Sequence, residues 1–173
     1  MTRYVSWVPT QTEYINTFFE LCPISPSDVV YDLGSGDGRL LFAAAEKGAG
    51  KCVGVEIDSE CVKLARETAK EKRLDGKVIF IEADVLTVDL SEASIIMCYL
   101  LSSASAALKP KFEKELKPGT RVIMESFPVP GWKPVVVTDN NGRIFYYYIM
   151  PAEITDDYKT SVGTPVYNYY EYF

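Results

Sequence analysis

The sequence predicts an α/β domain in which helices cover both faces of a mostly parallel sheet. The apolar segments expected to form buried strands lie at residues 29–32, 51–55, 78–81, 94–101 and 121–126. Amphipathic helical patterns at 40–47 and 59–73 separate the first three strands. The segment 139–142, Asp-Asn-Asn-Gly, predicts a tight turn that joins two last strands into an antiparallel hairpin. Alternation of strands and helices is typical of parallel sheets.

Local signals predict the remaining elements. Thr10 and Glu13 have the spacing of a capping box, which predicts a helix with Thr10 as its N-cap that ends near Leu21. Asp58 is the expected cap of the helix at 59–73. Further short helices are predicted to begin at 102–103 and to span 110–116, and the hairpin strands are expected at 134–138 and 143–150.

The 173 residues are enough for a single domain with a substantial core. We divide residues 1–173 into an N-terminal helix segment (1–24), a core (25–150) and a tyrosine-rich tail (151–173). The tail is expected to pack as an edge strand or to lie across the surface, with an aromatic interaction segment as the alternative.

Composition excludes several classes of protein. No apolar run approaches about 18 residues and the N-terminus lacks a signal-peptide pattern, so we expect a cytoplasmic protein with no membrane span. The absence of histidine excludes Ser-His and Cys-His catalysis, and we expect no metal site. None of the four cysteines is in a C-x-x-C pair, so they are expected to be core thiols; they are Cys22, Cys52, Cys61 and Cys98.

The formal net charge of −6 bears on the partners. Proteins that bind duplex DNA normally present a basic face, so direct binding of nucleic acid is not expected. An acidic surface favours basic partners such as lysine-rich proteins. The same charge has a second explanation, which is simple solubility, and the sequence leaves both open.

A glycine-rich turn at 32–38 is the most informative segment. Asp32 ends the first predicted strand, and Gly34, Gly36 and Gly38 follow at alternate positions before a helix begins. Glycines let a ligand approach the backbone, and the start of the helix offers free N–H groups. In an open α/β sheet this arrangement predicts a nucleotide-type pocket beyond the carboxyl end of the strand, although a plain tight turn has the same pattern.

The acid at Asp32 indicates which nucleotide binds. Dinucleotide sites use G-x-G-x-x-G and place a pyrophosphate at the helix start, whereas this loop is G-x-G-x-G with a carboxylate that would repel phosphate. S-adenosylmethionine (AdoMet) carries no phosphate and has an α-ammonium group that Asp32 can hold. An NAD enzyme is therefore disfavoured.

Two further acids follow the next two strands. Glu56 lies about 20 residues beyond the loop, where dinucleotide sites place the acid that binds ribose hydroxyls. Asp84 follows the third strand and is positioned to accept a hydrogen bond from an adenine amino group. Each alone would be an ordinary surface acid at a strand end, but three acids after three successive strands predict a site.

These motifs resemble the seven-β-strand (class I) methyltransferases over about residues 25–150. Residues 32–38 look like their motif I, Glu56 like the ribose acid and Ala83-Asp84 like the adenine-edge motif. The resemblance implies a Rossmann-like seven-stranded mixed sheet, helices on both faces, a C-terminal antiparallel hairpin and AdoMet as cofactor. The residues expected to bind the cofactor are Thr10, Asp32, Gly34, Ser35, Gly36, Gly38, Glu56, Ile57, Ala83, Asp84 and Val85.

A narrower resemblance rests on 7–10 (Trp-Val-Pro-Thr), 32–39 and 127–132 (Phe-Pro-Val-Pro-Gly-Trp). These segments are similar to the archaeal broad-specificity protein lysine methyltransferases, whose animal mitochondrial relatives methylate the ATP synthase c-subunit and the adenine nucleotide translocase. Those relatives carry a membrane segment before the domain, and this chain shows none. The resemblance implies methyl transfer from AdoMet to the ε-amino groups of lysines in proteins, with broad specificity.

The acceptor side is predicted near Tyr99. Enzymes that methylate adenine amino groups resemble one another in an Asn/Asp-Pro-Pro-Tyr/Phe motif, whereas residues 97–100 here are Met-Cys-Tyr-Leu. The missing amide and prolines argue against base amino groups and glutamine. Tyr99 is our catalytic candidate as a wall of the acceptor channel, together with Trp7, and strand-end packing is the alternative. Residues 127–132 either border the mouth of this channel or form a rigid connector with Trp132 buried.

A lysine acceptor must lose a proton before it attacks. An apolar channel and a neighbouring sulfonium both lower the pKa of the ammonium, so solvent can take the proton without a dedicated base. The leading hypothesis is thus a monomeric protein-lysine methyltransferase with lysine-rich substrates. The alternatives are a methyltransferase for a small molecule or RNA and a non-catalytic AdoMet-binding module.

Overall fold

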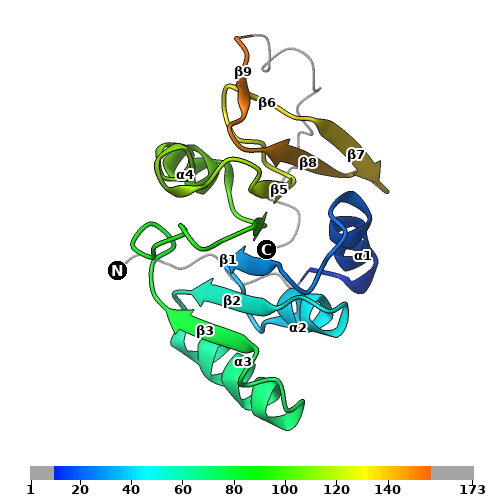
Figure 1. Cartoon of the computed structure of the whole chain (residues 1–173), viewed down its shortest axis with the longest axis vertical. Helices are drawn as coiled ribbons and strands as arrows, with labels where there is room; N and C mark the ends of the chain where they lie inside the picture. Colours follow the sequence, from blue (N-terminus) through cyan, green and yellow to red (C-terminus); the bar gives the residue numbers. More distant parts are fainter. Residues whose placement is uncertain (1–9, 157–173) are drawn as a thin grey trace, which may run out of the picture.

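A seven-stranded mixed sheet runs through the protein in the strand order β3-β2-β1-β4-β5-β8-β7 (Figure 1). The computed structural model describes residues 10–156. The parallel strands are β1 (Val29–Leu33), β2 (Lys51–Glu56), β3 (Val78–Glu82), β4 (Ile95–Cys98) and β5 (Arg121–Glu125). The chain starts in the middle of the sheet, builds outward to β3 and then crosses to β4. The carboxyl ends of β1 and β4 therefore flank the point where the strand order reverses, which is where open α/β sheets bind ligands.

An antiparallel hairpin completes the sheet as predicted. Its strands are β7 (Val136–Asn140) and β8 (Arg143–Ile149), and β8 pairs with β5. Asn141 and Gly142 both have positive φ, 51° and 86°, which is the geometry of a tight turn whose twist matches the strands. The predicted Rossmann-like seven-stranded sheet is confirmed.

Helices cover both faces because the strand side chains alternate. Val30, Met97 and Phe145 belong to one apolar core with α1 (Thr12–Leu21), α2 (Arg39–Glu46) and α3 (Ser59–Glu71). Tyr31, Cys98 and Tyr146 are their chain neighbours and point into a second core that contains α4 (Ser102–Glu115). Cys22, Cys52 and Cys98 are buried free thiols, as expected, whereas Cys61 is only half-buried.

The start of α1 differs from the prediction. Gln11, not Thr10, is the N-cap, and no side-chain hydrogen bond caps this helix. The carbonyl oxygen of Thr10 instead accepts a hydrogen bond from Nη1 of Arg39 at 3.3 Å, so the chain turns into the helix one residue later. Asp58 caps α3 as predicted, because its side chain accepts hydrogen bonds from the backbone N–H groups of Glu60 and Cys61.

The two predicted short helices after β4 are one helix, α4, with Pro110 inside it. A proline normally breaks a helix by removing a hydrogen bond and crowding the preceding turn. Ser105, Leu108 and Phe112 are fully buried along one stripe of α4 on both sides of the proline. Burial of this stripe against the second core outweighs the cost of the proline.

The tail contributes one short strand. Residues Glu153–Ile154 form β9, which pairs with β6 (Trp132–Lys133) in a separate two-stranded sheet, not at the edge of the main one. Predictions about Trp7 and about residues 157–173 lie outside the described part of the chain. Within residues 10–156, none of the helices has the length and apolar character needed to cross a membrane.

We predict that Gly38→Ala destabilises the fold more than Gly48→Ala. Both glycines have positive φ, but a Cβ at Gly38 would lie 2.4 Å from Cζ of Phe80, whereas a Cβ at Gly48 would meet nothing within 4 Å. We expect a loss of unfolding free energy of about 3 kcal/mol for Gly38→Ala and about 1 kcal/mol for Gly48→Ala, measured by urea denaturation. Equal losses would show that backbone strain alone matters at both sites.

Candidate active site

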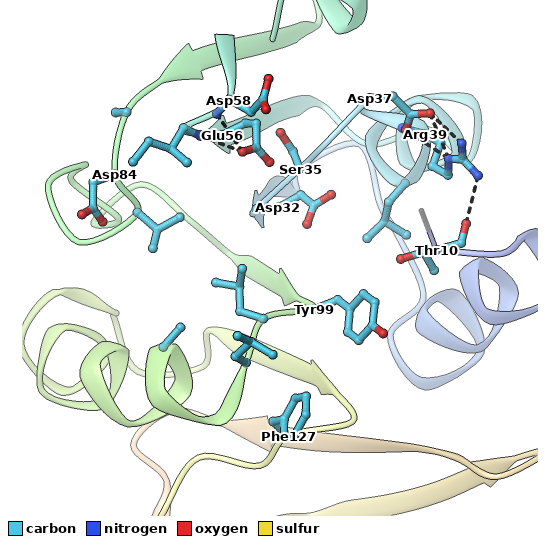
Figure 2. Close-up of a pocket in the computed structure, with 18 of the residues that line it drawn as sticks. Thr10, Asp32, Ser35, Asp37, Arg39, Glu56, Asp58, Asp84, Tyr99 and Phe127 are labelled. Carbon is cyan, nitrogen blue, oxygen red and sulfur yellow. Dashed lines mark hydrogen bonds and ion pairs between the residues drawn. The ribbon is translucent and has the colours of Figure 1, made fainter. Parts of the chain in front are cut away.

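A cavity of about 410 Å³ opens beyond the carboxyl ends of β1, β2, β3 and β4 (Figure 2). Ten of the twelve predicted site residues line it: Thr10, Asp32, Gly34, Ser35, Glu56, Ile57, Ala83, Asp84, Val85 and Tyr99. The parallel strands bring these residues together although they are widely separated in the sequence, because all four strands end at the same edge of the sheet. The structure therefore gathers the three acids and Tyr99 around one space.

Two predicted residues, Gly36 and Gly38, do not line the cavity. Gly36 has a φ of 52°, and its N–H donates a hydrogen bond to Oε2 of Glu56 at 2.9 Å. Gly38 starts α2 in the left-handed conformation and leaves room for the ring of Phe80. In the described structure both residues shape the loop from behind the cavity wall.

Asp32 is a buried carboxylate that no residue in the range 10–156 neutralises. Its side chain faces the cavity (Figure 2), the residue is 6% exposed, and among the described residues it forms no ion pair or hydrogen bond. Burial, together with the smaller effects of the negative charges of Glu56, Glu125 and Asp37, raises the pKa of Asp32 to about 8. A cation in the cavity would restore the charged form, so the site fits an ammonium group.

Glu56 is held by three backbone N–H groups. Oε2 accepts from Gly36, and Oε1 accepts from Ile57 at 2.8 Å and from Asp58 at 3.0 Å. The carboxylate thus fixes the glycine loop in addition to facing the cavity. The sequence spacing suggested only the contact with a ribose, because a hydrogen bond to a loop 20 positions away leaves no local signal.

The next part of the cavity is an apolar slot. Ile57, Ala83 and Val85 line it, and Ile57 is 52% exposed although it is a large apolar residue. Asp84 stands beside them, with Oδ1 accepting a hydrogen bond from the N–H of Leu86 at 2.9 Å. This arrangement fits a flat heteroaromatic ring with an amino group at its edge.

Sequence reasoning missed the residues that tie the chain before α1 to the glycine loop. Nε of Arg39 donates to both carboxylate oxygens of Asp37, at 3.0 and 3.1 Å, and Nη1 donates to the carbonyl of Thr10. This places Thr10 at the cavity (Figure 2). The only available signal was the Asp-Gly-Arg that ends the glycine loop.

The remaining wall is largely apolar and aromatic. Tyr99, Leu100, Leu101 and Phe127 contribute to it, and Figure 2 shows the Tyr99 ring between Asp32 and Phe127. The two alternatives for residues 127–132, a border of the cavity and a connector with a buried tryptophan, each hold for a different residue. Phe127 borders the cavity, whereas Trp132 is fully buried and its Nε1 donates to Glu113 at 3.0 Å.

The strand order and the position of this cavity define a Rossmann-like methyltransferase. A family model described as the ANTKMT methyltransferase domain matches residues 32–136. The chain belongs to this family.

Several relatives cover most of the chain. A protein-lysine N-methyltransferase of Saccharolobus islandicus is 38% identical over 152 residues, which are 85% of this chain and 94% of that protein. The adenine nucleotide translocase lysine N-methyltransferase of Mus musculus is 31% identical over 163 residues, 94% of this chain and 69% of that protein. The predicted family is confirmed.

A solved structure is equally close. A protein described as an RNA methyltransferase from Salinibacter ruber, in complex with S-adenosylhomocysteine, is 39% identical. It superposes with a TM-score of 0.82 and covers 87% of this chain and 98% of that one. S-adenosylhomocysteine is the demethylated product of AdoMet, in agreement with the predicted cofactor.

We predict that AdoMet binding is coupled to deprotonation of Asp32. Because the pKa of Asp32 is about 8 in the free protein, the carboxyl is mostly protonated at neutral pH, and a bound ammonium must displace that proton. Calorimetry in buffers of different ionisation enthalpy should therefore show proton release near pH 7. Affinity should rise from mildly acidic pH up to about pH 8.

Asp32→Asn is the control for this prediction. The amide is of similar size and does not titrate, so the variant should bind AdoMet more weakly and without the buffer dependence. Proton release of the same size in Asp32→Asn would show that another group titrates.

Proposed function

We propose that this methyltransferase transfers the methyl group of AdoMet to the ε-amino groups of lysines in proteins. The observation that carries the proposal is the match along 94% of the length of a protein-lysine N-methyltransferase. The chemistry of the cavity supports it, because a cation-binding carboxylate at one end faces an apolar, aromatic wall at the other.

The positions of Asp32, Glu56 and Asp84 indicate how the cofactor lies in the cavity. We assign the α-ammonium group to Asp32, the ribose hydroxyls to Glu56 and the adenine amino group to Asp84, with Ile57 and Val85 against the adenine ring. When bound, AdoMet supplies a methyl group activated by a sulfonium. The carboxylate of Glu56 is already oriented by backbone N–H groups, so binding requires little reorganisation.

The acceptor enters along Tyr99, Leu101 and Phe127 in this proposal. Their apolar surfaces exclude water from the lysine and lower the pKa of its ammonium, and the proton passes to solvent. The neutral amine then attacks the methyl carbon. The N–C bond forms as the S–C bond breaks, and the electron pair of that bond remains on sulfur. The protein's contribution is alignment of nitrogen, carbon and sulfur, which needs no histidine.

The description of the Salinibacter ruber protein makes RNA the second candidate acceptor. The cavity of this chain is lined by the acids Asp37, Asp58 and Asp84, and the chain has a formal net charge of −6. Such a surface repels a phosphate backbone and attracts basic segments, which favours lysine-rich proteins. The broad specificity, monomeric state and cytoplasmic location expected from the sequence are parts of the same proposal.

The test is a comparison of acceptor pools. The full chain is incubated with AdoMet and, in separate reactions, with lysine-rich proteins, total RNA or a metabolite extract, and the products are analysed by mass spectrometry. We expect mass increments of one or more methyl groups on lysine-containing peptides. Methylated RNA together with unmodified protein would show that the acceptor is RNA and not a protein lysine. Cofactor binding without any product would indicate a non-catalytic module.

We predict that Tyr99→Ala lowers turnover much more than AdoMet affinity. Loss of the ring widens the acceptor side, so kcat should fall by about tenfold or more while the calorimetric Kd for AdoMet changes little. Tyr99→Phe is the matched variant, because it keeps the ring and removes only the hydroxyl, and it should retain most activity. Parallel losses of turnover and cofactor affinity would place Tyr99 on the cofactor instead.

A further inference from the structure

A row of three side chains, Asp32, Met97 and Ile123, crosses the sheet next to the cavity, on the face covered by α1. Met97 of β4 is in register with Asp32 on one side and with Ile123 on the other. Tyr99 and Glu125 each lie two residues beyond this row, so the sheet brings the two together at its carboxyl edge. The cavity contains Asp32 and Tyr99 but not Glu125.

Glu125 is a fully buried carboxylate paired with Arg143 at the start of β8. It lies opposite Phe145 in the β5–β8 register, and Oε1 accepts a hydrogen bond from Nη1 of Arg143. Oε2 is buried and has no hydrogen-bond partner among the described residues. Glu125 does not line the cavity, so its direct contact is with Arg143, and it acts on Asp32 only through its charge.

Arg143 contacts two aromatic rings. Its guanidinium carbon lies 4.4 Å from the ring centre of Tyr14 in α1 and 5.1 Å from that of Tyr99. A planar guanidinium stacks on rings while it hydrogen-bonds a carboxylate, which a lysine ammonium does not do. Arg143 therefore connects a buried carboxylate on β5 to Tyr99, one of the side chains that we assign to the acceptor wall.

We propose that Arg143 is a positioning residue for methyl transfer: held by Glu125, its guanidinium fixes the Tyr99 ring as the wall that aligns the acceptor lysine. The inference rests on the proposed function. Isolated buried ion pairs contribute little to stability compared with apolar replacements of the same size, so stability alone does not account for this one. The hairpin turn at Asn141-Gly142 places Arg143 at the site by setting where β8 begins.

The test compares Arg143→Lys, Arg143→Met and the double variant Glu125→Gln/Arg143→Met. The double variant removes both charges together and so avoids an uncompensated buried carboxylate if Arg143→Met alone fails to fold. Each full-length variant is assayed for kcat and acceptor KM on a protein whose lysines the wild-type chain methylates. Its AdoMet Kd is measured by calorimetry. We expect kcat to fall by about tenfold or more in the double variant and in Arg143→Lys, with AdoMet Kd unchanged in Arg143→Lys, which keeps the Glu125 charge that acts on Asp32.

A matched control exists at the opposite end of the same strand. Arg121 begins β5 and pairs with Asp28, which is 4% exposed, and neither residue lines the cavity. Asp28→Asn/Arg121→Met removes an equivalent ion pair far from the acceptor wall. It should leave kcat unchanged, whatever it does to the urea midpoint.

The outcomes separate the two proposals. If the wild-type chain methylates no lysine, the proposed function fails before any variant is assayed. If the wild-type chain is active and the Arg143 variants match it, only the positioning role is overturned. Full activity in Arg143→Lys, or a loss of AdoMet binding in step with kcat, would overturn it as well.

Discussion

The buried carboxylate of Asp32 is the constraint around which the rest of the site is organised. It lies on the central strand β1, where the strand order reverses and where no helix or side chain of the described structure neutralises it. Burial raises the pKa of Asp32 far above its unfolded value of 3.8, so the free protein loses stability as the pH rises from about 4 toward 8. A bound ammonium removes this cost. In the proposed function, the same feature that weakens the empty protein gives the cofactor its affinity and sets its orientation.

Asp32, Glu56 and Glu125 lie at or near strand ends and have three different environments, and the differences indicate their roles. Glu56 is oriented by backbone N–H groups, Glu125 is buried against Arg143, and Asp32 has neither arrangement. Burial raises the pKa of Glu125, whereas its hydrogen bond with Arg143 acts in the opposite direction. A carboxylate with a permanent partner is structural, whereas a buried one that faces a cavity without a partner requires a ligand.

The sequence predicted the fold and most of the cavity because both depend on local patterns. Strand ends, glycine spacing and the Asn-Gly turn are visible within short windows, and the parallel sheet then brings Asp32, Glu56 and Asp84 together. Where tertiary packing overrides propensity, the predictions were wrong: Thr10 is not the helix cap, and Pro110 does not divide α4. Arg143 carried no signal at all, because the role proposed for it depends on an ion pair with Glu125 of β5 and on a contact with the ring of Tyr99, both far away in the sequence.

The lack of histidine places a limit on how such a site can accelerate its reaction. Asp37 and Glu125 are held in ion pairs and Asp58 caps α3. Because the proposal assigns the remaining carboxylates of the cavity to the cofactor, no carboxylate is assigned to remove the acceptor's proton. The contributions to catalysis that remain are the alignment of the reacting groups and the exclusion of water. Both depend on rigid cavity walls and not on proton transfer by a side chain. A flexible wall would lose this contribution, because an aromatic ring on a strand-end loop samples several rotamers unless its surroundings hold it. The guanidinium of Arg143, itself anchored on a neighbouring strand, provides that restraint at Tyr99.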